Sequence, residues 1–440
     1  MRKRKRSQHT ENGINGEHQS SRLDLDCLTE SHDLCPITYV YDYLPDKTKW
    51  LQPQSVSLPN IRAEVEQQRS PILTEHQDRK RNSILLDGRA ARFPLHTGLV
   101  DFRQNKFWRA TEEATIELLE LVAQDSRCGR LILRDKRSMS DLAREQLRVG
   151  VRDSYNRFTV HMLADADETR IRLLAQSMML IFIFDDVWEN SSSTTIESLR
   201  DSFVSIIQGS GFPKSPLEHK MAEMREGFLA CDAKKGNGGT EVLQTLIDFC
   251  YHSKPTPGDF RGVRDYLNYR WEDIANNFAW ACAKFAVESS ADSSDLKFCG
   301  ILRLLGDHIS LANDLASYEK EKRHYETGRM AAIVNVVNVL MTRDRLDAKA
   351  AKVMAFAWQL YVENEIIEEV KRLGSDGGLS SDEWTFIEAC FTAVSGSFMS
   401  AVVMWRYGGE SAKVSESADE GSPETLARSA KKGLKAKSKT

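Results

Sequence analysis

The middle of the chain repeats apolar residues at intervals of three and four positions, which is the spacing of one face of an α-helix. This pattern predicts helices over residues 111–124, 170–188, 241–251, 260–288, 296–325, 330–342, 346–372 and 380–406. Few segments alternate apolar and polar residues as strands do, and glycine and proline gather between the periodic runs. We therefore expect an all-α fold, in which long sequential helices form a single bundle around a shared apolar interior.

The two ends of the chain differ from this helical middle. Residues 1–90 are polar and contain prolines that interrupt any long helical period, at positions 36, 45, 53, 59 and 71. Residues 410–440 are rich in Ser, Glu, Lys and Ala, a composition typical of disordered tails. We expect a largely irregular N-terminal extension over 1–90, one helical domain over 91–409 and a disordered tail over 410–440.

Composition and charge exclude several classes of protein. The chain has 60 basic and 64 acidic residues, a net charge of −4, so it offers no global positive field to nucleic acid. No stretch reaches the roughly 18 consecutive apolar residues of a membrane span, and the first residues lack the apolar segment of a secretory signal. The eight cysteines are scattered without a C-x-x-C pair, which argues against a disulfide framework or a structural zinc site. We expect a cytoplasmic protein without a nucleic-acid partner.

One predicted helix carries an apolar row that ends in carboxylates. Leu174 and Met178 lie on one face of the segment 173–190, and Asp185 continues that face. Glu189 follows four residues later on the same side. A carboxylate in line with a buried face is costly unless it is paired or binds a metal ion. The alternative is a helix that simply leaves the core and ends in solvated acids.

A second predicted helix also carries an apolar row that ends in polar side chains. Asn313, Ser317 and Glu321 are spaced four residues apart, about 6 Å along one face, and Leu305 and Ile309 precede them on that face. An amide oxygen, a hydroxyl and a carboxylate suit a hard cation such as magnesium. The set carries too little charge to bind the ion alone, as expected where phosphate oxygens of a substrate complete the coordination. An exposed polar helix face is the alternative.

The two segments resemble the paired metal motifs of class I terpene cyclases, D-D-x-x-(D/E) and N-D-x-x-S-x-x-x-E. The separation of 128 residues between Asp185 and Asn313 is similar to that in microbial sesquiterpene cyclases. That family also has an arginine that senses diphosphate some forty residues before the second motif, a lysine just before its glutamate, and a closing Arg-Tyr pair. The matching positions here are Arg270, Lys320, Arg406 and Tyr407.

The resemblance implies an enzyme, a magnesium-dependent lyase of fungal or bacterial secondary metabolism. Its substrate would be a linear prenyl diphosphate, above all farnesyl diphosphate, which it would ionise and cyclise to a sesquiterpene hydrocarbon or alcohol with release of diphosphate. Three magnesium ions are implied, held by Asp185, Glu189, Asn313, Ser317 and Glu321 together with the substrate. The implied catalytic residues are Asp185, Arg270, Arg406 and Tyr407, and the implied diphosphate-binding residues are Arg270, Lys320, Arg406 and Tyr407. We expect a monomer or a homodimer.

A carbocation must be kept from water in an apolar, aromatic cavity, since aromatic faces stabilise cations. Candidates to line a central cavity are Phe182, Trp188, Phe249, Phe278, Trp280 and Phe398, although ordinary core packing is the alternative for each. The chain departs from the family at Ser400, where many relatives have tryptophan. It also departs at Ile274, where a glycine at a helix break is common. Asp273 is a candidate relay between Arg270 and the substrate.

Two further functions stay open at this stage. One is a chain-elongating or diterpene-type prenyl diphosphate enzyme, and the other is a non-catalytic helical binding protein that retains the fold. An elongating synthase needs a second aspartate-rich motif, whereas this chain has Asn-Asp-Leu-Ala-Ser at 313–317. The complete set of candidate metal ligands and cations argues against a binding protein.

Overall fold

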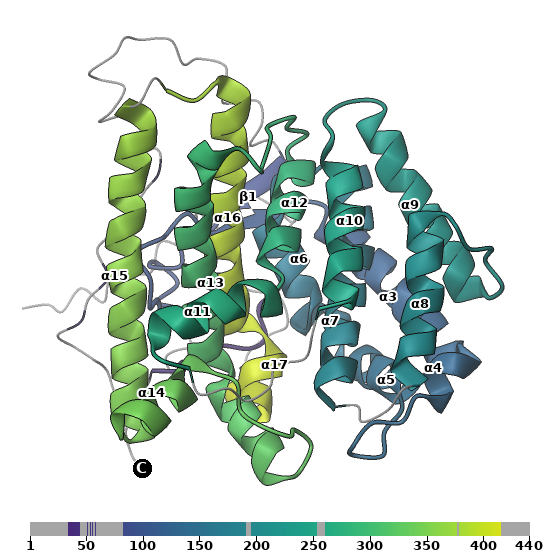
Figure 1. Cartoon of the computed structure of the whole chain (residues 1–440), viewed down its shortest axis with the longest axis horizontal. Helices are drawn as coiled ribbons and strands as arrows, with labels where there is room; N and C mark the ends of the chain where they lie inside the picture. Colours follow the sequence, from purple (N-terminus) through teal and green to yellow (C-terminus); the bar gives the residue numbers. More distant parts are fainter. Residues whose placement is uncertain are drawn as a thin grey trace, which may run out of the picture.

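The computed structural model describes residues 34–44, 51, 53, 55, 58, 82–190, 195–252, 260–375 and 378–414, with only the backbone described at 188–190 and 195. Nearly all regular structure in these residues is helical (Figure 1), which confirms the predicted all-α class. The exception is a small antiparallel sheet of β1 (Ser83–Leu85) and β2 (Arg103–Asn105), in which Ile84 lies opposite Gln104.

The helices follow one another along the described chain with short connections. They are α3 (Trp108–Gln124), α4 (Ser126–Arg130), α5 (Met139–Val149), α6 (Asn156–Met162), α7 (Glu168–Asn190), α8 (Thr195–Gln208), α9 (Pro216–Asp232), α10 (Gly238–Cys250), α11 (Val263–Asp273), α12 (Asn276–Ala286), α13 (Leu296–Glu326), α14 (Val336–Asp344), α15 (Ala348–Ser375), α16 (Ser381–Val403) and α17 (Trp405–Gly408). Two short 3-10 turns, Val151–Asp153 and Gly409–Ala412, complete the set.

Several of these helices have no counterpart among the predicted runs, namely α4, α5, α6, α8 and α9. In two of them buried polar side chains interrupt the apolar row, Arg157 in α6 and Glu218 in α9. Helix α8 does keep a buried row at helical spacing, Ile196, Leu199 and Phe203, and was nevertheless missed from the sequence. The run predicted over 330–342 is also shorter than expected, because α14 begins only at Val336, where the Asn335 side chain caps the helix. Length does not separate the predicted helices from the missed ones, because α8 and α9 have 14 and 17 residues whereas α14, within a predicted run, has nine.

Helix α13 forms the centre of one half of the molecule. It packs against α11, α14, α15, α16 and α17, as Figure 1 shows, while α7 contacts α3, α6, α9, α10 and α12 in the other half. Asp295 caps the start of α13, and its row of Leu302, Leu305 and Ile309 is buried. This row leads directly to Asn313, so the apolar interior of the bundle ends at the candidate metal motif.

Helix α16 is the one described helix that is long and apolar enough to cross a membrane. Its most apolar window is 94% buried inside the protein, and a capping box at Ser380 and Glu383 begins it. Burial on that scale is typical of a core helix. The structure therefore agrees with the expectation that the chain has no membrane span, as far as the described part goes.

The single helix predicted over 260–288 is divided in two. Ala275, between α11 and α12, has φ 57° and ψ 42°, the left-handed conformation that a residue with a Cβ rarely adopts. The chain changes direction there, so the helix break that the family resemblance implies is present without a glycine. A Cβ on Gly306 of α13 would lie 2.7 Å from the side-chain Nδ2 of Asn276, the first residue of α12. Glycine at 306 therefore lets α13 approach the break between α11 and α12.

Residues 34–44 pack against the helical domain and pair with its C-terminal end. Tyr39 forms an antiparallel bridge with Lys413. Backbone hydrogen bonds on either side of it join Val40 to Ala412 (2.9 Å), Tyr41 to Val402 (2.6 Å) and Val414 to Thr38 (2.7 Å). These residues and β1 lie before the predicted domain boundary at 91, and residues 410–414 lie after the predicted boundary at 409. The packed unit is thus wider at both ends than the sequence pattern indicated.

Candidate active site

Helix α7 ends in two adjacent aspartates with different surroundings. Asp185 continues the buried row of Leu174 and Met178, and its side chain is 34% exposed. Asp186 is 16% exposed and accepts two hydrogen bonds from Arg406, 2.9 Å from Nη2 to Oδ1 and 3.0 Å from Nη1 to Oδ2. The sequence predicted Asp185 on the buried row but gave no role to Asp186.

Tyr155 completes the contact between Arg406 and Asp186. Its hydroxyl donates to the Asp186 carboxylate and accepts from Arg406, while the guanidinium lies 4.8 Å from the centre of its ring. The same ring stacks on Phe182, with ring centroids 4.5 Å apart and planes 9° apart. Tyr155 is buried, so it holds the arginine and the aspartate against an aromatic surface.

The charges around Asp186 keep its carboxylate ionised. Burial acts to raise the pKa of Asp186, but the Arg406 guanidinium, with help from Lys320 on α13, outweighs burial and holds the pKa well below its ordinary value. Lys320 is buried, with 7% exposure. Lys320 on α13 therefore adds to the positive charge that Arg406 places near Asp186.

The second motif forms a row of oxygens on α13. Ser317 Oγ donates to Glu321 Oε1 at 2.5 Å. Asn313 is bound on both sides, because its Oδ1 accepts from Arg270 Nη2 at 3.1 Å and its Nδ2 donates to the Tyr407 hydroxyl at 2.8 Å. The structure thus brings the candidate arginine sensor and the Arg-Tyr pair to the first residue of the motif.

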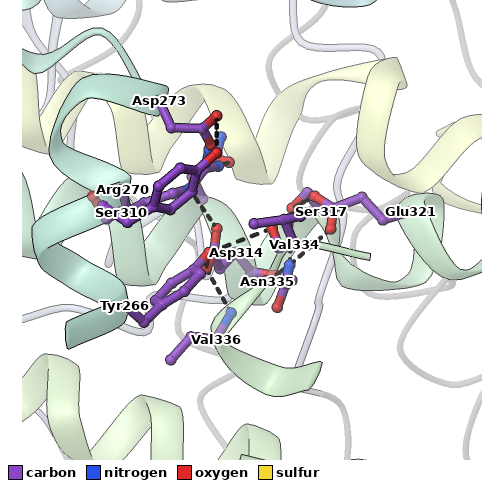
Figure 2. A network of polar contacts seen from close by, with 12 residues as sticks. Tyr266, Arg270, Asp273, Ser310, Asp314, Ser317, Glu321, Val334, Asn335 and Val336 are labelled. Atoms are coloured by element: carbon purple, nitrogen blue, oxygen red, sulfur yellow. Dashed lines mark hydrogen bonds and ion pairs between the residues drawn. The ribbon is translucent and has the colours of Figure 1, made fainter. Parts of the chain in front are cut away.

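Arg270 reaches the motif from the last turn of α11 and binds two carboxylates as well (Figure 2). Its Nε donates to Asp314 Oδ1 at 3.1 Å, and its Nη1 binds Asp273. Asp314 is fully buried and also accepts from the Tyr266 hydroxyl and from the backbone N–H of Val336. Burial raises the pKa of the Asp314 carboxyl, although Arg270 opposes that shift.

The residues of the second motif suit an oxygen-binding cation. Glu321 is 7% exposed, and within the described residues no lysine or arginine nitrogen lies within 4.0 Å of its carboxylate. Burial, and next to it the Asp314 charge, raise the pKa of Glu321, while the Ser317 hydroxyl and the charges of Lys320 and Arg270 oppose that shift. Amide, hydroxyl and carboxylate oxygens are the donors that magnesium prefers. Within the described residues no three His, Cys, Asp or Glu side chains lie together so that they could hold a metal ion. The candidate set on α13 contains one such side chain, Glu321, and its other members are Asn313 and Ser317.

Comparison with known proteins decides the family. Residues 176–357 match the family described as terpene synthase family 2, C-terminal metal binding. Terpene cyclase 6 of Gibberella fujikuroi is 27% identical over 317 residues, which cover 71% of this chain and 82% of that protein. Terpene cyclase aneC of Aspergillus aculeatus is 25% identical over 344 residues, covering 76% of this chain and 75% of that one. The chain is a class I terpene cyclase.

A solved structure supports the fold of this terpene cyclase independently. The crystal structure of aristolochene synthase from Penicillium roqueforti superposes with a TM-score of 0.52 at 20% identity, covering 66% of this chain and 93% of that one. At that identity the likeness concerns the fold alone. It confirms the helical terpenoid synthase fold expected from the sequence.

The aromatic residues predicted to line a cavity occupy different surroundings in the terpene cyclase. Phe182 is half-buried one turn before the aspartates, and Phe249 is half-buried on α10. Phe398 packs against Tyr43 and Phe102, with ring centroids 6.3 and 6.1 Å away. Phe278 and Trp280 on α12 are also buried. The side chains of Trp188 and Glu189 lie outside the described part of the chain.

Several residues of the candidate site in this terpene cyclase were not singled out from the sequence. Asp186 and Asp314 occupy the second position of the two motifs, so the motifs themselves marked both residues as candidates for the site. Tyr155 and Asn335 gave no signal, because they lie outside both motifs and meet them only in the folded chain. Asp273, which the sequence suggested as a relay between Arg270 and the substrate, is bound to Arg270 in the structure.

Proposed function

We propose that this terpene cyclase ionises a linear prenyl diphosphate, farnesyl diphosphate in the first place, and cyclises the resulting carbocation with release of diphosphate. The product would be a sesquiterpene hydrocarbon or alcohol. The aristolochene synthases among its relatives support a sesquiterpene product, among them the Penicillium roqueforti protein, which is 24% identical over 239 residues.

One observation carries the proposal, a chain of contacts that joins four separated segments. Arg270 donates to Asn313, and Asn313 donates to Tyr407. Arg406, next to that tyrosine, binds Asp186 at the end of α7. The segments lie far apart in sequence, yet their side chains meet around the end of α7 and the middle of α13. A diphosphate needs cations and hydrogen-bond donors from several directions, and this arrangement supplies them.

Each group has a role in this proposal. Asp185 and Glu189 on α7, with Asn313, Ser317 and Glu321 on α13, would hold magnesium. When bound, the ions neutralise the charge that develops on the leaving diphosphate. Arg270, Lys320, Arg406 and Tyr407 would bind diphosphate oxygens directly and exclude water from the cation. Asp273 and Asp314 orient Arg270 through its two ion pairs.

A prenyl-chain elongating or diterpene-type enzyme is the alternative within the same chemistry. The second motif argues against elongation, because Asn313 and Ser317 stand where a second aspartate-rich motif would be needed. A non-catalytic binding protein loses support, because the named relatives are terpene cyclases.

The test is a product assay with the full-length protein. Ten-, fifteen- and twenty-carbon prenyl diphosphates are supplied separately, with and without isopentenyl diphosphate, and with magnesium or with excess chelator. Cyclic fifteen-carbon products that require magnesium, detected by mass spectrometry of extracted hydrocarbons and alcohols, are the expected result. Longer prenyl diphosphates in the isopentenyl arm would establish elongation instead. Cyclic twenty-carbon products as the main output would establish a diterpene enzyme.

A further inference from the structure

A residue outside both motifs contacts the second motif at three points. Asn335 precedes α14 and is fully buried. Its Nδ2 lies 2.9 Å from the Asp314 carbonyl oxygen, 3.4 Å from Ser317 Oγ and 3.1 Å from Glu321 Oε2. Figure 2 shows Asn335 between Asp314 on one side and Ser317 and Glu321 on the other. One amide group therefore touches two of the candidate metal ligands.

The other end of the same side chain is also occupied. Asn335 Oδ1 accepts the backbone N–H of Val337 at 2.9 Å and so caps α14. The neighbouring N–H of Val336 binds the Asp314 carboxylate at 2.8 Å. The start of α14 is thus fixed to α13 through two side chains, and the Asn335 amide cannot turn over without losing both sets of contacts.

The two oxygens of Glu321 are made different by this arrangement. Oε2 accepts from Asn335, and Oε1 accepts from Ser317 at 2.5 Å. An amide N–H on Oε2 fixes the rotation of the carboxylate, so Oε1 and the Ser317 hydroxyl stay together on one side. Two ligand oxygens of one cation must lie side by side in this way, and hydrogen bonds behind the ligands commonly hold them there.

We propose that Asn335 is a positioning residue for the metal site: its amide holds Glu321 and Ser317 in the arrangement that binds a divalent cation, and its carbonyl oxygen fixes α14 in place. This inference rests on the proposed function, because it takes magnesium and diphosphate as the ligands. Asn335 does not contact the cation itself. It sets the direction in which Glu321 presents Oε1, the oxygen beside the Ser317 hydroxyl.

The decisive variant is Asn335→Ser. A serine is as good a helix cap as asparagine, so α14 keeps its cap, but the shorter side chain cannot reach Glu321. We expect the magnesium concentration for half-maximal turnover to rise about 10- to 100-fold, the range typical for loss of a residue behind a metal ligand. The rise in melting temperature caused by magnesium with inorganic diphosphate should shrink at the same ligand concentrations.

A matched control lies one turn further along α14. Asn338 is half-buried, and its Nδ2 donates to the carbonyl oxygen of Ile333 at 3.1 Å without contacting the second motif. Asn338→Ser removes an amide donor from the same loop and helix and should leave the magnesium requirement unchanged. If Asn335→Ser does not fold, Asn335→Asp keeps the size and the cap, removes the N–H donor, and should shift the magnesium requirement in the same direction.

The outcomes separate this inference from the proposed function. Absence of any magnesium–diphosphate melting shift in the wild-type protein would contradict the proposed function and, with it, this inference. A normal wild-type shift with an unchanged or lower magnesium requirement in Asn335→Ser or Asn335→Asp would overturn the role of Asn335 alone. A purely structural role predicts that Asn335→Ser and Glu321→Gln add in their effects on the ligand-induced shift. A positioning role predicts that the double variant is no worse than Glu321→Gln.

Discussion

Arg406 binds Asp186 through two parallel N–H···O contacts of 2.9 and 3.0 Å. A bidentate pair fixes an angle as well as a distance, so it orients α17 against the end of α7. Tyr407 follows directly and accepts a hydrogen bond from Asn313. The two candidate metal motifs are therefore connected through the dipeptide Arg406–Tyr407. A substitution in either motif is expected to change the side-chain positions in the other.

The first prediction concerns the ligands of the proposed metal ions. Asp185→Ala and Asn313→Ala should each lower kcat/KM by at least about 100-fold, since loss of a metal contact costs several kcal/mol of transition-state stabilisation. Circular dichroism should show an intact helical fold in both variants. Asn338→Ala serves as the control with near wild-type turnover. Full turnover of the wild-type protein in excess chelator would contradict the assignment of these residues.

The second prediction concerns closure on diphosphate. Arg406→Ala should reduce the melting shift caused by magnesium with diphosphate, and should increase linear and alcohol products because water gains access to the cation. Arg406→Lys keeps the charge but loses the fork that binds Asp186, so an intermediate shift is expected. A wild-type shift and product profile in Arg406→Ala would show that this arginine takes no part in closure.

The third prediction concerns the stability that the buried ion pair between Arg270 and Asp314 gives to the free protein. Arg270 faces Asp314, which is fully buried, so Arg270→Ala leaves an unpaired buried charge and should destabilise the free protein by about 3 kcal/mol or more. Asp314→Asn in the same chain removes that charge and should recover part of the loss. Denaturant titration of the single and double variants measures this directly. If the second substitution adds further destabilisation in full, the ion pair is not the source of the effect.

The fourth prediction is a loss of stability in mild acid. Burial, with the nearby Arg157 charge, lowers the pKa of His161 to about 3, and its Nδ1 lies 2.9 Å from the Arg103 carbonyl oxygen. An unfolded histidine titrates near 6.5. Between these values the unfolded chain binds a proton that the folded one does not, so stability should fall by about 1.4 kcal/mol per pH unit below about pH 6.

His161→Asn provides the comparison for this effect. Asparagine can donate the same hydrogen bond to Arg103 but does not titrate, so its cost in packing should be independent of pH. The difference in unfolding free energy between wild type and variant should therefore narrow as the pH falls from 7 to 5. A constant difference across that range would mean that His161 is not the group responsible.

The fifth prediction tests the N-terminal segment. Tyr43 is 1% exposed and packs against Phe398, while its hydroxyl has no hydrogen-bond partner among the described residues. Tyr43→Ala should cost about 3–5 kcal/mol of stability. Tyr43→Phe should cost nothing or stabilise, because it removes an unsatisfied buried group. Equal, small effects of both substitutions would show that residues 34–44 add little to the fold.

The sequence and the structure agree best where one helix face runs without interruption. The role of Asp185, Asn313, Ser317 and Glu321 as metal ligands stays a prediction, but their positions on α7 and α13 were predictable because each extends a buried apolar row at helical spacing. Tyr155 and Asn335 were not, because a contact between distant segments leaves no trace in the local spacing of either one. Their partners lie on other helices, and only the packing of α6 against α7 and of α14 against α13 brings them together.

The break between α11 and α12 shows a different limit. Ala275 is a good helix former, and the residues around it keep helical spacing, so nothing local predicts a left-handed residue. The packing of α12 against α10 and α16 competes with that preference in the folded chain. The N-terminal prolines, similarly, indicated correctly that 34–44 contains no helix, but not that Tyr39 and Tyr43 are buried.

The bridge between Tyr39 and Lys413 closes the described chain into a ring, with its first and last segments hydrogen-bonded a few residues from Arg406. Force applied between the two ends would load this short pairing before any helix. A mechanical pull would therefore separate residues 34–44 from the segment that follows Arg406 while the bundle stays intact. Because the proposed function needs Arg406 and Tyr407, activity should then be lost at a smaller force than the fold.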